Sequence, residues 1–406
     1  MIKQIDVGEL RVGMYVDKLD TSWMNHPFLR NQFKINEISD VGKIKKSGAK
    51  VVYINTEKGL DVSSEVDVNQ PIAVKRTELE SSPDQAPASV SVAEEMEKAL
   101  IVRQEAGRVI TNIMADVRLG KQVDTEQVSP VVEQMLGTIF RNQDAFLGLT
   151  RIRDMDQYTF EHSISVSALM IAFAKKLGLD ESVIWEVGVG GILHDIGKLQ
   201  VPEKILNKPG RLTEDEFSIM RGHVGFGTRL VDETDAIPKN ALRVLLQHHE
   251  RLNGTGYPGR LSGEEISLYG KMAAIVDVYD AITSDRVYHK GKMPSVVLRQ
   301  LIEWSGEGVF DQELVQRFIQ CVGIYPVGTV VALESQRLAV VIASPQKALL
   351  NPVLNVIYDL SQDCFLTPEY LNLAESASGD RILKPVSPEQ YNIQIADYLD
   401  QNRDSL

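Results

Sequence analysis

Residues 191–198, Gly-Ile-Leu-His-Asp-Ile-Gly-Lys, constrain this chain more than any other stretch, because they place His194 and Asp195 side by side in an apolar helical run. Burying an imidazole next to a carboxylate costs free energy unless something binds both groups. A metal ion would bind both, since histidine supplies a neutral nitrogen and aspartate supplies an oxygen that can bridge two ions. The stretch therefore predicts a metal site, provided that the chain supplies further ligands.

The composition is that of an ordinary globular protein and narrows the classes of function. The 406 residues are 43% hydrophobic, which predicts two or three domains with a sizeable core. The net charge of −13 argues against binding of a nucleic acid polymer by the whole surface, and a phosphate site would need local cations or metals. The two cysteines, Cys321 and Cys364, fit no ligand spacing, so we expect a reduced, cytoplasmic protein. We find no apolar signal core and no run of roughly 20 apolar residues, so no membrane partner is expected.

Hydrophobic periodicity and composition divide the chain into five predicted regions. They are a small α/β module that we expect to be regulatory (1–75), a flexible linker rich in proline, serine and acids (76–92), two amphipathic connecting helices (93–148), an almost wholly helical region (149–325) and a β-rich C-terminal appendage (326–406). The expected fold class is therefore multidomain and mainly α, with an all-helical core between a small α/β module and a small β-rich appendage.

Local patterns predict individual elements at both ends of the chain. Residues 50–55 read as a buried strand that follows a short helix at 41–47. In the appendage, strands are expected at 330–333, 338–342 and 353–358, before a helix near 389–398. The appendage contains no histidine, so any histidine-rich site must lie upstream of it.

Five of the seven histidines lie between residues 162 and 249, at apolar helical positions. Any one of them alone would more often be a core histidine that is satisfied by protein groups. Together with two acids in apolar helices they form a stronger signal; the set is His162, His194, Asp195, His223, His248, His249 and Asp277. Seven ligands without a cysteine exceed the four of a structural zinc site. They suit two ions bridged by a carboxylate, an arrangement typical of phosphoester hydrolysis.

The order His162, then His194-Asp195, then Asp277 resembles the HD superfamily of metal-dependent phosphohydrolases. Three stretches resemble the HD-GYP subfamily, whose members hydrolyse cyclic dinucleotides, chiefly cyclic di-GMP: HDIGK at 194–198, ILNKPGRLT at 205–213 and HHERLNGTGYP at 248–258. The resemblance covers about 150–325 and implies an all-helical HD-type phosphohydrolase core with cyclic-dinucleotide phosphodiesterase activity. Residues 1–75 also resemble, less specifically, the uncharacterised domain that often precedes HD-GYP domains.

The resemblance implies two divalent metal ions, with iron or manganese as the expected metals. The ligands of the first ion would be His162, His194, Asp195 and Asp277, and those of the second Asp195, His223, His248 and His249. Some members of the family bind a third ion through a glutamate one helical turn before the first histidine. Tyr158 stands at that position here, which predicts two ions, and we do not count the adjacent Glu161.

The same resemblance implies the residues that act on the substrate. Asp195 and Lys198 would be catalytic, with Lys198 contacting a phosphate or protonating the leaving oxygen; the alternative is a lysine that pairs with a helix dipole. Arg286 would bind a phosphate, or else form an ordinary helix-end salt bridge, and Lys290 is a second basic residue nearby. Tyr257 would offer a ring face to a guanine, unless its Gly-Tyr-Pro motif is only a turn.

Two positions depart from the family pattern. Asn253 stands where the family usually has an aspartate, and His289 stands where a basic residue usually assists Arg286. If the aspartate only supports the loop through hydrogen bonds, an asparagine can replace it. If its charge orients a metal-bound histidine, activity falls. A neutral His289 would weaken the phosphate contact at neutral pH.

The sequence therefore predicts a metal-dependent phosphodiesterase that hydrolyses cyclic di-GMP to pGpG, GMP or both through a two-metal site. Two alternatives stay open. One is a preference for 3',3'-cyclic GMP-AMP, because nothing in the sequence reads the base at N2 or O6. The other is a weakly active cyclic-dinucleotide sensor or interaction protein. The expected partners are the cyclic dinucleotide and either a second copy of the chain or a signalling protein.

Overall fold

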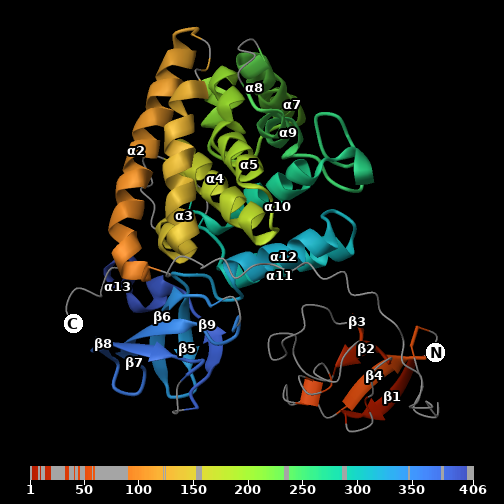
Figure 1. Cartoon of the computed structure of the whole chain (residues 1–406), viewed down its shortest axis with the longest axis vertical. Helices are drawn as coiled ribbons and strands as arrows, with labels where there is room; N and C mark the ends of the chain where they lie inside the picture. Colours follow the sequence, from red (N-terminus) through yellow and green to blue (C-terminus); the bar gives the residue numbers. More distant parts are fainter. Residues whose placement is uncertain are drawn as a thin grey trace. The chain divides into compact units, whose positions relative to one another are not determined.

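The computed structural model divides the chain between Gln85 and Ala86 into two units (Figure 1). The residues that it describes are 2–7, 10, 14–19, 33–35, 41, 44–45, 51–56, 58–59, 90–121, 123, 125–151, 158–232, 237–285, 290–345, 348–375 and 379–399. The predicted linker at 76–92 lies outside the described residues up to position 89, and so do Arg286 and His289. The mainly helical fold class with two small sheets is confirmed.

The first unit contains a four-stranded antiparallel sheet. Its strands are, in spatial order, β1 (Ile2–Asp6), β4 (Val51–Asn55), β2 (Tyr15–Leu19) and β3 (Phe33–Lys34). In β4 every second residue is buried, which is the pattern of a strand with one face on a core. The strand predicted at 50–55 is confirmed as β4, and the described residues of the predicted helix at 41–47, namely 41, 44 and 45, are helical.

The second unit begins with two long helices that lie side by side, α2 (Val92–Arg118) and α3 (Ser129–Leu149) (Figure 1). Ser91 and Glu94 form a capping box that satisfies free N–H groups at the start of α2. A two-nitrogen ion pair from Arg141 of α3 to the fully buried Glu95 of α2 fastens the helices together. Two long helices are therefore present where the sequence predicts two amphipathic ones.

The helical core lies between residues 158 and 322, within the region that the sequence predicts to be helical. Its elements are α4 (Tyr158–Lys176), α5 (Glu181–Leu193), η5 (Ile196–Gln200), α6 (Glu203–Leu206), α7 (Glu214–Arg221), α8 (His223–Asp232), α9 (Lys239–Gln247), η6 (Gly263–Glu265), α10 (Leu268–Thr283), α11 (Pro294–Gly306) and α12 (Gln312–Val322). The apolar helix α5 packs against α3, α4 and α9. A helix that is apolar all round is typical of the interior of a bundle.

Close backbone approaches at two glycines fix how this bundle packs. A Cβ atom on Gly191 of α5 would lie 2.6 Å from the Cα of Ser167 on α4. A Cβ atom on Gly197 of η5 would lie 1.9 Å from the carbonyl oxygen of His223. Both distances are far below van der Waals contact, so only glycine permits these approaches. The second approach brings the chain after His194 and Asp195 directly against the start of α8.

The C-terminal part of the second unit is a five-stranded antiparallel sheet in the order β8-β7-β6-β5-β9. The strands are β5 (Val330–Leu333), β6 (Arg337–Ala343), β7 (Val353–Asp359), β8 (Cys364–Asn372) and β9 (Ile382–Pro385). The three predicted strands are present, and β8 and β9 add two that the sequence reading did not predict. The helix expected near 389–398 is wrong as a single helix, because that stretch holds two short pieces, η7 (Pro388–Tyr391) and α13 (Ala396–Leu399). Asn392 between them has a φ of 53°, a left-handed conformation that ends the first piece.

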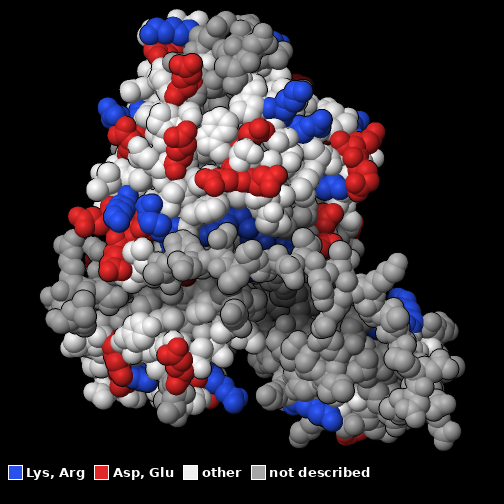
Figure 2. All heavy atoms as spheres, in the orientation of Figure 1, with Lys and Arg blue, Asp and Glu red and all other residues white. Residues whose placement is uncertain are grey.

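On the face that Figure 2 presents, the charged side chains of the described residues form no dominant basic surface. Acidic and basic residues alternate over the helical part of the second unit on this face. Among the described helices, none combines the length and the apolar character that crossing a membrane requires.

Candidate metal centre

The seven predicted ligands come from the ends of helices and from one position inside a helix. His162 lies in the second turn of α4, His223 is the first residue of α8, and Asp277 lies within α10. The expectation that His194 and Asp195 both lie inside a helix is wrong, because α5 ends at Leu193. His194 caps α5 and Asp195 precedes the 3-10 helix η5. The chain leaves the helix there so that Gly197 can pack on His223.

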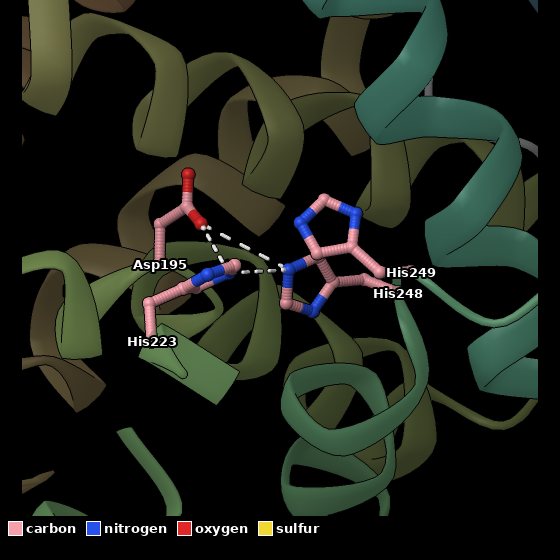
Figure 3. Close-up of side chains that lie close together, drawn as sticks. All are labelled: Asp195, His223, His248 and His249. Carbon is pink, nitrogen blue, oxygen red and sulfur yellow. Dashed lines mark hydrogen bonds and ion pairs between the residues drawn. The ribbon is translucent and has the colours of Figure 1, made fainter. Parts of the chain in front are cut away.

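Asp195 lies between two groups of imidazoles. Its Oδ2 atom is 3.3 Å from Nε2 of His194 and 3.6 Å from Nε2 of His162. Its Oδ1 atom is 3.3 Å from Nε2 of His223 and 3.8 Å from Nε2 of His248. Figure 3 shows Asp195 and His223 facing the adjacent rings of His248 and His249. The two oxygens of one carboxylate thus face different histidine groups, which is the geometry of a bridging ligand.

Two clusters have ligand atoms close enough to hold an ion. His162, His194 and Asp195 form the first, and Asp195, His223, His248 and His249 form the second, with all ligand atoms of each cluster within 4.8 Å of one another. Atoms that bind one ion at about 2.1 Å lie roughly 3 Å apart, close to the shorter separations between Asp195 and its imidazoles. The ring centroids of His248 and His249 are only 4.0 Å apart, since both residues follow the end of α9.

Asp277 stands between the two clusters. Its Oδ1 atom is 3.2 Å from Nε2 of His162 and 3.9 Å from Nε2 of His194. Its Oδ2 atom is 3.6 Å from Nδ1 of His249. The structure therefore brings all seven predicted residues together, with Asp277 closest to the first cluster.

Hydrogen bonds on the far side of the rings orient four of the imidazoles. The Nδ1 atoms of three of them lie 2.7–2.9 Å from the backbone carbonyl three residues earlier; the pairs are His194 with Gly191, His223 with Met220 and His248 with Leu245. The Nδ1 atom of His162 lies 2.7 Å from the Asp280 carboxylate. An Nδ1–H that donates to such an acceptor leaves the Nε2 lone pair pointing into the centre. Metal-binding histidines are typically held in this way.

The pKa shifts at this centre favour neutral imidazoles for His248 and His249 and an ionised carboxylate for Asp195. Burial lowers the pKa of His248 well below its ordinary value and lowers the pKa of His249 to about 3. Burial would raise the pKa of Asp195, but the charge of Lys198 beside it holds that pKa well below the usual range. His162 differs, because hydrogen bonds to Asp277 and Asp280 overcome its burial and raise its pKa to about 9. Metal binding requires neutral imidazoles and ionised carboxylates.

Two buried polar atoms of this centre have no hydrogen-bond partner: Nε2 of His194 and Oδ1 of Asp195. Leaving such atoms unpaired costs about 1–3 kcal/mol each, and more for a charged group. Because Nδ1 of His194 and of His223 donates to a carbonyl, their neutral rings turn Nε2 lone pairs toward the Asp195 oxygens, an arrangement that is repulsive unless a cation lies between them. The donor set, all imidazole nitrogen and carboxylate oxygen, suits divalent transition metals. These residues therefore fit a metal-binding role.

The loop that carries Tyr257 lies against the second cluster. The Tyr257 ring is 4.6 Å from the ring of His249, centroid to centroid, and the Tyr257 N–H donates to the carbonyl of His249. The buried Glu250 accepts hydrogen bonds from the backbone N–H groups of Gly259 and Leu261. Asn253 accepts two hydrogen bonds from Thr255 within the loop. The amide oxygen of Asn253 thus supports the loop without a carboxylate.

The remaining predicted site residues differ in where they lie. Lys198 places its Nζ atom 2.5 Å from Oδ2 of Asp195, so it belongs to the centre. Lys290 is exposed and forms ion pairs with Asp285, at 3.1 Å, and with Glu389, at 3.9 Å. Neither partner belongs to the clusters. Arg286 lies outside the described residues, as does the side chain of Tyr158.

Sequence reasoning missed two supporting residues. Asp280 holds His162 and follows Asp277 by three positions on α10, so the helical spacing of two acids in an apolar run was an available signal. Glu250 follows the histidine pair directly, and only the folded loop reveals its two backbone partners.

Comparison with known proteins places the chain in a family. A family model described as "HD domain" matches residues 138–314, and one described as "Domain of unknown function (DUF3391)" matches residues 2–128. The protein called "Cyclic di-GMP phosphodiesterase PA4108" of Pseudomonas aeruginosa is 38% identical over 98% of this chain and 95% of its own length. The protein called "3'3'-cGAMP-specific phosphodiesterase 1" of Vibrio cholerae is 37% identical over 41% of this chain and 38% of its own length.

Among solved structures, Bd1817, an HDG"Y"P protein from Bdellovibrio bacteriovorus, aligns with a TM-score of 0.47 and 17% identity, over 78% of this chain and 98% of that one. The near full-length relative and the "HD domain" match agree with the motifs at 194–198 and 248–258. The chain belongs to the HD-GYP family of HD-domain cyclic-dinucleotide phosphodiesterases, and its N-terminal part to the uncharacterised DUF3391 domain family.

Proposed function

We propose that this chain hydrolyses cyclic di-GMP to pGpG, GMP or both at a centre of two divalent metal ions. The single observation that carries the proposal is the position of Asp195, whose two oxygens face separate imidazole groups. The partnerless Nε2 of His194 and Oδ1 of Asp195 support it, because a cation at each group would satisfy them. We assign the activity to residues 149–325, between the connecting helices (93–148) and the C-terminal appendage (326–406).

In this proposal the first ion is held by His162, His194, Asp195 and Asp277, and the second by Asp195, His223, His248 and His249. Two such ions, when bound, supply a water of lowered pKa and neutralise charge on the phosphate. Iron and manganese are the metals we expect, because an imidazole-rich site with carboxylates suits both. Because Asp195 belongs to both ligand groups, its side chain fixes the position of one group relative to the other.

Three side chains of the chain act on the substrate in this mechanism. Lys198 is partly exposed beside Asp195, so its ammonium group can donate to a phosphate oxygen or to the leaving oxygen. Tyr257 presents a ring next to His249 on which a guanine can stack. Arg286 would bind the phosphate through its guanidinium group. We give Lys290 a secondary role, because it forms ion pairs with Asp285 and with Glu389 of η7, neither of which belongs to the metal clusters.

Cyclic di-GMP is the substrate that we favour, because the relative that aligns with almost the whole chain carries that activity in its name. The relative named for 3',3'-cyclic GMP-AMP covers less than half of the chain, and it supports that dinucleotide as the second candidate. The weakly active sensor is disfavoured, since Asn253 retains its hydrogen bonds to Thr255 and the ligand set is complete. The two free cysteines fit the expected cytoplasmic location.

The test combines metal analysis with product analysis. Purified protein should contain two divalent ions per chain and release pGpG or GMP from cyclic di-GMP faster than it cleaves 3',3'-cyclic GMP-AMP. Asp195→Ala should lose both ions and at least about 100-fold in rate, because the bridge is shared. Asp116→Ala, at the surface of α2, is the control and should keep both. Tight substrate binding without product would favour the sensor, and two ions in Asp195→Ala would refute the assigned ligands.

A further inference from the structure

The first metal cluster depends on a ligand that lies near the start of a helix. His162 is the fifth residue of α4, which begins at Tyr158. His162 therefore lies just after the first turn, whose N–H groups lack intrahelical partners, and helix ends open more readily than helix centres. A metal ligand there needs contacts from outside the helix, because useful ligand geometry tolerates displacements of only about 0.5 Å.

One side of this turn is held by α10. The Nδ1 atom of His162 lies 2.7 Å from the Asp280 carboxylate, and both residues are buried. This bond orients the ring from the side of α10. Neighbouring helical residues point about 100° apart, so the preceding residue faces a different neighbour.

That neighbour is α2. Arg103 of α2 contacts Oε2 of Glu161 through Nη2, at 2.7 Å, and through Nε, at 3.2 Å. The side chains are only 12% and 9% exposed, so solvent screens this ion pair little. The contact of a planar guanidinium through two nitrogens also fixes direction, which a single contact does not.

A second contact supports the same turn from α2. A Cβ atom on Gly107 would lie 3.2 Å from Cε2 of Phe160, so the absence of a side chain at this position lets the ring approach the helix backbone. Phe160, Glu161, Arg103 and Gly107 also line one groove of about 440 Å³ between the two helices. The two residues that precede His162 therefore both rest on α2.

We propose that Arg103 and Glu161 are positioning residues which hold His162 in place, so that α2 sets the affinity of the first metal cluster. Glu161 touches neither a metal ligand atom nor the substrate in this proposal; it acts through the backbone that it shares with His162. The inference rests on the proposed metal centre and adds that one cluster, but not the other, is controlled from α2. The second cluster shares Asp195 with the first but draws its other ligands, His223, His248 and His249, from α8 and from the end of α9.

The test titrates the metal-stripped full chain with Mn²⁺ and resolves the binding of each ion. His162→Ala and His248→Ala first assign each binding event to a cluster. Glu161→Gln should then weaken the His162-dependent event about tenfold or more and leave the His248-dependent event unchanged. Arg103→Lys keeps the charge but loses the two-nitrogen contact, so it should give a smaller loss.

The matched control is Glu95→Gln, which breaks a second ion pair of α2, from the buried Glu95 to Arg141 on α3. It leaves the Arg103–Glu161 contact intact and so should not change the His162-dependent event, and melting temperatures will verify that all variants fold. Unchanged Mn²⁺ affinity in both Glu161→Gln and Arg103→Lys would overturn the proposal, as would an equal loss in Glu95→Gln. If wild-type protein binds two ions but cleaves no cyclic dinucleotide, only the proposed function fails. If no binding event depends on His162, the proposal fails together with the metal centre.

Discussion

At the scale of single residues, four imidazoles of the centre divide their two nitrogens between two tasks. One nitrogen is committed to an anchor and the other faces the centre. For His194, His223 and His248 the anchor is a backbone carbonyl of the same local chain. A carbonyl carries no charge and cannot be removed by substitution. His162 is different, because its anchor is the side chain of Asp280.

This difference makes Asp280 the most accessible test of anchoring. Asp280→Ala should lower the metal affinity of the first cluster about 10- to 100-fold, because loss of such a supporting carboxylate typically has that effect. Asp280→Asn should lose less, since its amide oxygen can still accept the hydrogen bond from Nδ1 of His162. Equilibrium dialysis against Mn²⁺, with total metal measured per chain, gives both affinities.

The second metal cluster serves as the control for both Asp280 variants. The His223-containing cluster has its own anchors, so its affinity should be the same in both variants. Equal weakening of the two clusters would mean that Asp280 acts by stabilising the fold as a whole. A stronger loss in Asp280→Asn than in Asp280→Ala would contradict an anchoring role.

At the scale of elements, hydrogen bonds hold the loop that follows α9 at its two ends. The Tyr257 N–H donates to the His249 carbonyl at one end, and Glu250 accepts from Gly259 and Leu261 at the other. The backbone of the loop is thereby tied to the residue that follows the histidine pair. We expect this arrangement to place the Tyr257 ring for the substrate.

Glu250→Gln should therefore raise KM for cyclic di-GMP about tenfold while metal content stays at two ions. A hydrogen bond to a charged acceptor contributes roughly 1.5–3 kcal/mol, and glutamine replaces only one of the two carboxylate oxygens. Glu265→Gln is the matched control, because Glu265 also caps backbone in this loop region but is exposed. Steady-state kinetics measure the change in KM, and metal analysis shows whether the number of bound ions changes. A loss of metal in Glu250→Gln that matches the loss of activity would refute this assignment.

The elements also show why the sequence predicted the site better than its surroundings. Histidines and acids in apolar runs are conspicuous, and the structure brings all seven together. The anchors at Gly191, Met220 and Leu245 are backbone carbonyls. Every residue has such a group, so the sequence does not show which ones hold a histidine. Likewise the strand β8 contains Pro368 and lies at the edge of its sheet, two features that weaken the pattern of a strand.

At the scale of the whole molecule, the family boundaries and the structural units do not coincide. The match to the DUF3391 model runs to residue 128 and so includes α2, whereas the structural division falls after Gln85. The helix α2 packs on α3 and α4 within the second unit. The segment that belongs to the uncharacterised domain by sequence is therefore part of the second unit by packing.

A hydrogen bond between Asp144 and Ser344 joins the C-terminal sheet to the helical core. Oδ2 of Asp144 on α3 accepts a hydrogen bond from the backbone N–H of Ser344, at the end of β6, with a length of 2.8 Å. Burial raises the pKa of Asp144 from 3.8 to about 6, although the Ser344 hydrogen bond opposes the shift. A carboxyl group with a raised pKa in the folded state binds more protons than in the unfolded state between pH 4 and 6. Its ionisation therefore removes stability as the pH rises through that interval.

Asp144→Asn should remove this penalty, because the amide oxygen of asparagine can accept the same hydrogen bond and carries no charge. We expect the variant to be more stable than the wild type at pH 7, by on the order of 2 kcal/mol, and the difference to vanish near pH 4. Urea unfolding from pH 4 to 8 measures the difference in the free energy of unfolding between the two proteins. Titration of the metal ligands cancels in that difference, since both proteins carry them. A variant that is less stable at pH 7 would mean that the charged hydrogen bond to Ser344 outweighs the cost of burial, and that the junction is stabilised by ionised Asp144.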